Sequence, residues 1–164
     1  MKRILTRWLW LLTLSSLWAA AQGVPLAQDL QDDAGRNRHV PVLLFFVSEG
    51  CPYCATVEND YLAPMHRGGE LTGKAIVRKI DIDQPLPMKD FSGAETTHRD
   101  FARLMRSTFT PTLRLYSYRG RELAEAIVGF NTPEFYGGRI AGAIDEARAL
   151  LQRHNAGCRN RPAC

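Results

Sequence analysis

Two of the four cysteines in this 164-residue chain stand three positions apart, in the sequence Cys51-Pro52-Tyr53-Cys54. A Cys-x-x-Cys pair can exchange disulfides, close a structural disulfide, hold half of a zinc site or attach a haem. Haem attachment needs a histidine directly after the second cysteine, and Ala55 occupies that position. A zinc site needs a second pair of ligands at matching spacing. The other cysteines, Cys158 and Cys164, have five residues between them and lie in a tail, so redox chemistry is the favoured interpretation.

The elements around this motif must position the two sulfurs. Val40–Val47 is an almost continuous apolar, β-prone run, which is typical of a strand buried on both faces of a sheet. Pro52 suits the first turn of a helix, which we expect to continue to about Met65. The partial positive charge of a helix N-terminus stabilises a thiolate. We therefore expect Cys51 to be the exposed nucleophile and Cys54, one turn further on, to be the shielded resolving cysteine.

The rest of the chain alternates between strands and helices after a short helix within residues 22–38. We expect a strand at Lys74–Asp83, a loop at Gln84–Ala94, a helix at Thr97–Ser107, strands at Leu113–Tyr116 and Glu122–Val128, and a helix from Thr132 to about His154. Strands separated by helices favour parallel pairing, and the last two strands form an antiparallel hairpin. The sequence thus predicts an α/β fold with one mixed sheet of about four strands and helices on both faces.

Residues 1–21 have the features of a secretory signal peptide. A basic start precedes an apolar run from Trp8 to Trp18, and Ala19-Ala20-Ala21 offers the small residues of a cleavage site. A membrane anchor is the alternative, but a span needs roughly 20 apolar residues, and hydroxyl side chains interrupt this shorter run. We expect cleavage after Ala21, a periplasmic or secreted protein, and no stable membrane span in the mature chain.

Removal of this segment changes what the composition implies. The segment contains Lys2, Arg3 and Arg7, so the formal charge falls from +4 to +1 and the length from 164 to 143 residues. A charge this small gives no support for a nucleic-acid partner. The predicted organisation comprises a signal peptide (1–21), a polar segment with a short helix (22–38), an α/β domain (39–154) and a cysteine-containing tail (155–164).

Other residues with chemical potential favour structural roles. In an oxidising compartment Cys158 and Cys164 are expected to close a small disulfide in the tail, with intermolecular bridging or a second redox pair as alternatives. Asp81 and Asp83 alternate onto the same side of a strand end, which indicates a solvated pair. The four histidines lack ligand spacing, so we expect no metal site and interpret them as surface or capping residues: His39, His66, His98 and His154.

The motif and the element order together resemble the thioredoxin superfamily, from about Val40 to Leu151. The resemblance rests on Cys51-Pro52-Tyr53-Cys54, on Ile80–Gln84 at a strand end, on Thr110-Pro111-Thr112 before the next strand, and on Gly129-Phe130 before the last helix. Within the superfamily the chain is most similar to exported bacterial thioredoxin-like proteins, including those of periplasmic sulfur-oxidation systems.

This resemblance implies a three-layer thioredoxin-like fold in which the dithiol is itself the redox group and no further cofactor is needed. It also implies that Pro111 is cis and that the backbone of Thr110 pairs with an extended substrate segment, beside Pro52 and Tyr53. The implied partners are protein thiols and disulfides, together with an upstream periplasmic electron donor.

The chain departs from cytosolic thioredoxins at two places. Gly50 stands where they carry a tryptophan, and the strand before the motif lacks their buried aspartate. The acceptor for the Cys54 proton therefore stays open between Glu49, Glu58 and water. Pro-Tyr is also the dipeptide of glutaredoxins, but the signal peptide and the chain length argue against a cytosolic enzyme of that type.

The sequence thus predicts an exported thiol–disulfide oxidoreductase. The reducing direction is favoured because no histidine lies between the cysteines to stabilise the thiolate strongly. A disulfide oxidant or isomerase, or a non-enzymatic metal-binding module of the same fold, is the alternative. Because the carboxyl ends of parallel strands share one edge, we also expect the loop Gln84–Ala94 to border the dithiol and Pro85–Phe91 to influence partner choice.

Overall fold

The computed structural model describes residues 23–158, and side chains up to residue 155. The expected signal peptide and the expected disulfide between Cys158 and Cys164 lie outside the residues described in this way. The helices are α1 (Leu30–Arg36), α2 (Pro52–Thr56), α3 (Ala63–Arg67), α4 (His98–Leu104) and α5 (Pro133–Cys158), and a π-helical segment, η1 (Val57–Leu62), joins α2 to α3. The strands are β1 (Val42–Val47), β2 (Ile76–Asp81), β3 (Pro87–Lys89), β4 (Glu95–Thr97), β5 (Thr112–Tyr116) and β6 (Ile127–Val128).

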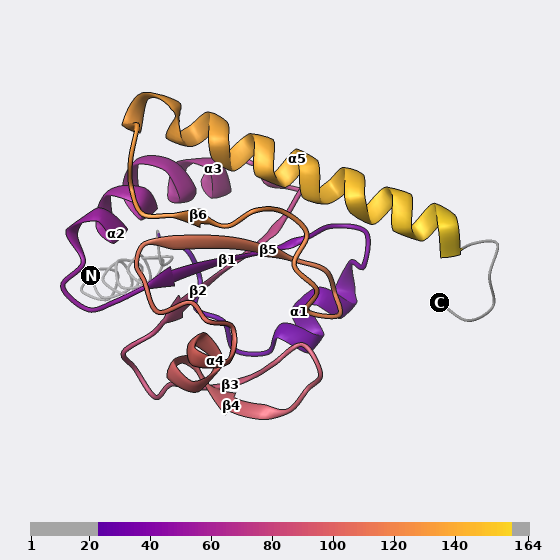
Figure 1. The fold of residues 1–164 in the computed structure, drawn as a ribbon, viewed down its shortest axis with the longest axis horizontal. Coiled ribbons are helices and arrows are strands. Elements are labelled where there is room, and N and C mark those ends of the chain that lie inside the picture. The colour runs from indigo at the N-terminus through magenta and orange to yellow at the C-terminus, as the bar shows by residue number, and fades with distance from the viewer. Residues whose placement is uncertain (1–22, 159–164) are drawn as a thin grey trace, which may run out of the picture.

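One mixed sheet has the strand order β2-β1-β5-β6 (Figure 1). It confirms the predicted sheet of about four strands. The expected parallel pairing holds for β1 and β2, but β5 runs antiparallel to β1, with Phe46 opposite Thr112. The reason is that β5 begins next to the carboxyl end of β1. This direction places the Thr110-Pro111 segment beside the loop that leads into the cysteine motif.

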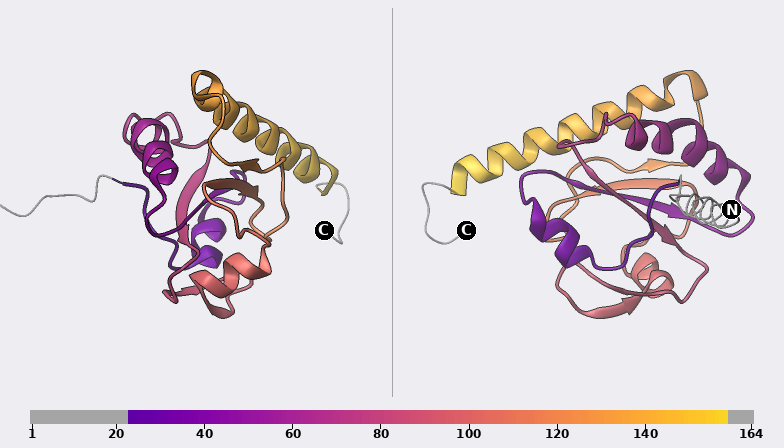
Figure 2. Two further views of the ribbon diagram at one scale, coloured as in Figure 1. Left: turned by 60° about the vertical axis from the view of Figure 1, so that its left-hand side comes forward. Right: turned by 180° about the vertical axis from the view of Figure 1, so that it is seen from behind.

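Strand β1 is buried on both faces, as its apolar run predicts. Leu43, Phe45 and Val47 belong to a core shared with the α2–α3 helix and α5. Its other three residues belong to a second core shared with α1 and α4. Figures 1 and 2 show these helices on opposite sides of the sheet. Strand β1 thus supplies three buried side chains to each core. Burial of each of them contributes about 1.5–3 kcal/mol to the free energy of folding.

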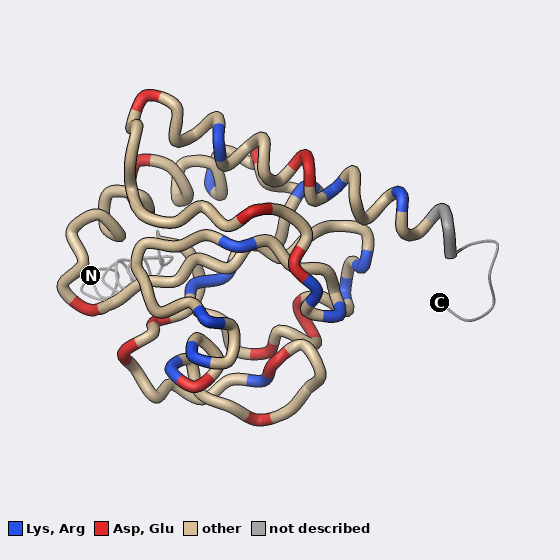
Figure 3. The backbone as a smooth tube through the Cα atoms, in the orientation of Figure 1, with Lys and Arg blue, Asp and Glu red and all other residues tan. Residues whose placement is uncertain are grey.

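Charged residues of both signs are interleaved along the chain (Figure 3). The most shielded pairs join α1 and η1 to β2. Arg78 donates from Nε and Nη2 to the Asp33 carboxylate, and Lys79 pairs with Glu58. Within residues 23–158, no helix combines the length and the apolar character that a membrane span requires.

The segment that follows β2 differs from the expected loop, because β3 and β4 form an antiparallel hairpin. Met88 is buried in the second core, and the Phe91 ring lies 6.2 Å from Phe101 and 5.5 Å from Tyr116. The prediction that Pro85–Phe91 borders the dithiol is therefore wrong. Burial of these two apolar side chains draws the hairpin toward α1 and α4, whereas Gln84, at the start of the segment, has its amide 3.5 Å from Glu49 of the motif loop.

His98 is also placed differently from the expectation, since its side chain is buried rather than at the surface. Its Nδ1 accepts the backbone N–H of Asp81 at 3.0 Å, so Nε2 carries the proton and donates to the Ala27 carbonyl at 2.8 Å. Burial lowers the pKa of His98, against the opposing effects of the Ala27 carbonyl and the Asp81 carboxylate. A neutral imidazole thus ties α4 and β2 to the segment before α1. The other three histidines are exposed.

We predict that stability falls between neutral and acidic pH because of His98. An unfolded histidine has a pKa of about 6.5, and the folded pKa is lower, so the unfolded state binds more protons as the pH falls through this interval. The stabilisation that comes from neutral His98 is complete above about pH 6.5 and is lost as the pH falls toward the pKa of His98 in the folded protein. Urea titrations at pH 7.5 and 5.0 measure the loss.

His98→Gln should lower the free energy of unfolding by about 2 kcal/mol at pH 7.5 and remove this part of the pH dependence. His66→Gln, at an exposed position on α3, is the matched control and should retain it. An unchanged pH dependence in His98→Gln would contradict the assignment.

Candidate active site

The cysteine motif forms the junction between β1 and α2. Gly50 has φ +68°, a left-handed conformation that favours glycine and allows the sharp turn after β1. Cys51 caps α2 with an extended backbone, and Pro52 occupies the first helical turn. The two sulfurs are joined in a disulfide, with the Cα atoms 5.3 Å apart. The Sγ of Cys51 accepts the backbone N–H of Cys54 at 3.1 Å, which is the type of contact that stabilises a thiolate once the disulfide is reduced.

Exposure separates the two cysteines in the predicted sense. Cys54 is 5% exposed, whereas Cys51 is partly exposed at the helix end. Between them, Pro52 and Tyr53 both reach solvent. An incoming sulfur therefore has access to Cys51, while Cys54 lies behind it.

The Thr110-Pro111 segment lies beside this junction. The peptide bond between the two residues is cis, as the resemblance implied. The Ser48 and Thr110 hydroxyl oxygens are 2.6 Å apart, which joins the segment to the loop before Cys51. The Pro111 carbonyl accepts the N–H of Gly129 at 2.8 Å. Thr110 is half-buried, and its role in substrate binding stays a prediction.

Aromatic side chains support the same region. The Phe130 ring lies 6.0 Å from Tyr53 and 5.0 Å from Tyr136. Tyr136 is buried, and desolvation raises the pKa of its hydroxyl to about 12, so it remains a donor to the Gly129 carbonyl at 3.2 Å. Four large apolar side chains in α2, before the Thr110-Pro111 segment, in β6 and at the start of α5 are exposed: Tyr53, Phe109, Val128 and Phe135.

Glu58 shares a cavity with the dithiol. It lines a cavity of about 420 Å³ together with both cysteines and residues of the motif loop. Its carboxylate is largely shielded and lies 2.8 Å from Lys79 Nζ through each oxygen. The backbone N–H of Val24 donates to its Oε1 at 2.9 Å. Of the two acids left open by the sequence, only Glu58 lines this cavity, because Glu49 lies on the exposed loop with its N–H bound to Asp83.

The sequence pattern did not indicate the partners of Glu58. Lys79 lies 21 residues away along the chain, and Val24 lies 34 residues away. The irregular helix around Glu58 had a detectable signal in Pro64. Proline offers no N–H to the carbonyl four residues earlier and its ring clashes there. The helix widens at η1, where the Ala63 N–H donates to the Glu58 carbonyl instead.

The described residues contain no group of three or more histidine, cysteine or acidic side chains arranged to hold a metal ion. The candidate active site comprises the dithiol, the Thr110-Pro111 segment next to it, the exposed apolar side chains of this region and the shielded Glu58 carboxylate.

Comparisons with known proteins identify the family of the chain. A family model described as a thioredoxin-like domain matches residues 26–138. Similar solved structures include a mutant thioredoxin from Halobacterium salinarum, with 22% identity, a TM-score of 0.48, and coverage of 74% of this chain and 91% of that one. They also include the reduced periplasmic thioredoxin SoxS from Paracoccus pantotrophus, with 25% identity, a TM-score of 0.44, and coverage of 65% and 98%.

Thioredoxin O2 from Arabidopsis thaliana is 14% identical, with a TM-score of 0.49 and coverage of 75% of this chain and 92% of that one. The search of curated proteins found no match. The family model spans more than half of the sequence and contains the disulfide-linked pair. The chain belongs to the thioredoxin-like domain family and is a thiol–disulfide oxidoreductase.

Proposed function

We propose that this protein is an exported reductase of protein disulfides, which passes two electrons from the Cys51–Cys54 dithiol to partner proteins without a further cofactor. The observation that carries this proposal is the partly exposed Cys51 at a helix N-terminus, beside the Thr110-Pro111 segment. Export and a periplasmic electron donor rest on the signal-like sequence of residues 1–21.

The reaction has two exchange steps. The Cys51 thiolate attacks one sulfur of the substrate disulfide, forms a mixed disulfide and releases the other substrate sulfur as a thiolate, which takes up a proton. Cys54 then loses its proton and attacks Cys51 Sγ. This second step forms the Cys51–Cys54 disulfide and releases the remaining substrate thiolate, so the protein is oxidised and the substrate is reduced by two electrons.

Substrate binding uses the exposed surface around the motif. We propose that an extended partner segment pairs with the Thr110 backbone, since strand addition gives affinity without requiring one particular side-chain sequence. The exposed Phe109 and Tyr53 side chains favour a segment that carries apolar residues. Pro52, which is also exposed, extends this surface next to Cys51.

Glu58 is the acceptor that we propose for the Cys54 proton, through a water in the shared cavity. A general base must reach its proton directly or through one water. Glu58 and Cys54 line the same cavity, which supports a relay through one water from the helix, in place of the strand aspartate that the chain lacks. Lys79 supplies the opposite charge that a shielded carboxylate needs in order to stay in this position.

The reduction potential of the Cys51–Cys54 pair tests the direction of electron flow. We expect a value near about −270 mV, typical of a reductant of this fold, rather than about −120 mV, typical of an oxidant. Equilibration in thiol redox buffers, followed by alkylation and mass measurement, gives the value. A potential at the oxidant end would reverse the proposed direction, and reduction of insulin disulfides should accompany the low potential.

Cys54→Ala should trap the mixed disulfide, because the second exchange step then lacks its nucleophile. The reduced variant is mixed with insulin, and the covalent adduct is measured by non-reducing electrophoresis and mass spectrometry. Cys51→Ala is the control and should give little adduct, since Cys54 is 5% exposed. Equal trapping by both variants would contradict the assignment of Cys51 as the nucleophile.

Glu58→Gln should slow the second exchange step by about 100-fold, the typical contribution of a positioned general base. Attack of Cys51 on the substrate should keep its rate, because a thiolate needs no base. Quenched-flow measurements should therefore show a mixed disulfide that accumulates in the variant and stays undetected in the native protein.

Glu49→Gln is the matched control, since Glu49 is an acid near the motif that does not line the cavity. It should resolve the mixed disulfide within about twofold of the native rate. A native rate in Glu58→Gln would overturn the role of Glu58.

A further inference from the structure

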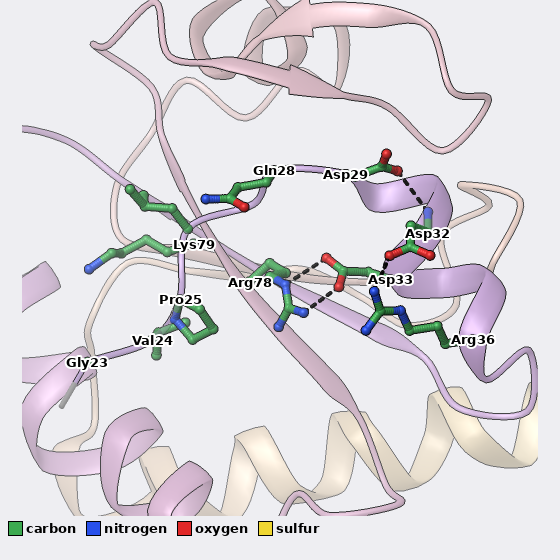
Figure 4. A pocket seen from close by; sticks show the side chains of 11 residues that line it. Gly23, Val24, Pro25, Gln28, Asp29, Asp32, Asp33, Arg36, Arg78 and Lys79 are labelled. Carbon is green, nitrogen blue, oxygen red and sulfur yellow. Dashed lines mark hydrogen bonds and ion pairs between the residues drawn. The ribbon is translucent and has the colours of Figure 1, made fainter. Parts of the chain in front are cut away.

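A short segment at the start of the described chain lies along the outer edge of β2. We define this strap as residues Gly23–Ala27 (Figure 4). The Lys79 N–H donates to the Pro25 carbonyl at 2.8 Å, and the Ala27 N–H donates to the Lys79 carbonyl at 2.9 Å. The strap therefore pairs with β2 as a parallel strand would, centred on one residue.

The inner side of the strap is anchored at three points. Val24 is 3% exposed and belongs to the core under the α2–α3 helix and α5. Ala27 is buried in the second core, and its carbonyl accepts the Nε2–H of His98. The outer side faces an open groove of about 750 Å³, which Figure 4 shows between the strap and α1. Contacts on the inner side thus hold the strap in place.

The same residue that binds the strap also binds Glu58. The Lys79 backbone makes both strap hydrogen bonds, and its ammonium pairs with the Glu58 carboxylate. The strap closes this arrangement, because the Val24 N–H donates directly to Glu58 Oε1. Strap, β2 and η1 therefore meet at one carboxylate.

Gly23 brings the strap close enough for this contact. A Cβ added at this position would lie 2.5 Å from Glu58 Oε1 and 3.5 Å from its carboxyl carbon. Real Cβ atoms do not approach other atoms so closely, so any side chain at position 23 has to displace the carboxylate or lift the strap. Gly35, by contrast, has open space around the corresponding Cβ position.

From these contacts we infer that the strap is a positioning element of the active site, which fixes the Glu58 carboxylate toward the dithiol cavity. This inference rests on the proposed role of Glu58 as proton acceptor. Because the strap acts through Glu58, it affects the step in which Cys54 loses its proton and leaves the attack by Cys51 unchanged. Gly23 and Val24 are then positioning residues rather than catalytic ones.

Gly23→Ala tests the inference. Resolution of the mixed disulfide should slow by about tenfold, since one donor to a charged group is lost and the base is misplaced. Formation of the mixed disulfide by Cys51 and the KM for insulin should stay within about twofold of the native values. Quenched-flow kinetics separate the two steps, and a thermal melt confirms that the variant is folded.

Gly35→Ala, on α1, is the control and should have native rates in both steps. Gly23→Ala combined with Glu58→Gln should be no slower than Glu58→Gln alone, because both changes act on one carboxylate. A native resolution rate in Gly23→Ala beside a slow Glu58→Gln would overturn the strap inference and leave the acceptor role standing. Native rates in both variants would overturn the acceptor role itself.

Hydrogen exchange gives a reading that does not depend on the folding of Gly23→Ala. In Glu58→Ala the Val24 amide loses its acceptor and should exchange at least about tenfold faster, whereas the Ala27 amide keeps the Lys79 carbonyl and its protection. Unchanged protection at Val24 would show that the strap and Glu58 are not coupled, and would overturn the inference.

Discussion

The structure depends on the burial of β1 on both faces. A strand that supplies two cores has no position where a charged side chain would reach water, and β1 carries none. The carboxylate beside the dithiol therefore comes from the helix that follows. Glu58 reaches the cavity from η1, where Pro64 makes the helix widen, and the fold keeps an acid behind the resolving cysteine without disturbing the central strand.

A carboxylate shielded in this way needs partners, because an unpaired buried charge is strongly destabilising. Lys79 supplies the opposite charge and Val24 supplies a backbone donor. Both partners come from the edge of the sheet beyond β1, so the position of the Glu58 carboxylate depends on a region that is remote from it in sequence. The antiparallel direction of β5 likewise brings a residue that is distant in sequence to the motif, since it places Thr110 beside the loop before Cys51.

Local patterns predicted the strand and helix at the motif, the helix beginning with Pro133 and the four-stranded sheet, because each has a periodicity or a start signal that is complete within a few residues. The prediction failed where distant contacts decide the outcome. The segment after β2 forms the β3–β4 hairpin, whose Met88 and Phe91 pack in the second core, instead of a loop at the dithiol. His98 is buried between the backbones of Asp81 and Ala27. The pairing of Glu58 with Lys79 likewise joins residues whose separation follows no local rule.

The strap has a second consequence, which concerns association between molecules. An open sheet edge is a template for pairing with another chain, and proteins commonly cover or shorten such edges. Here the strap covers the middle of the β2 edge, while the opposite edge strand, β6, is only two residues long. A strap that detached would expose backbone donors and acceptors next to apolar Val77. The segment that contacts the acid thus also occupies backbone groups of the β2 edge with which another chain could otherwise pair.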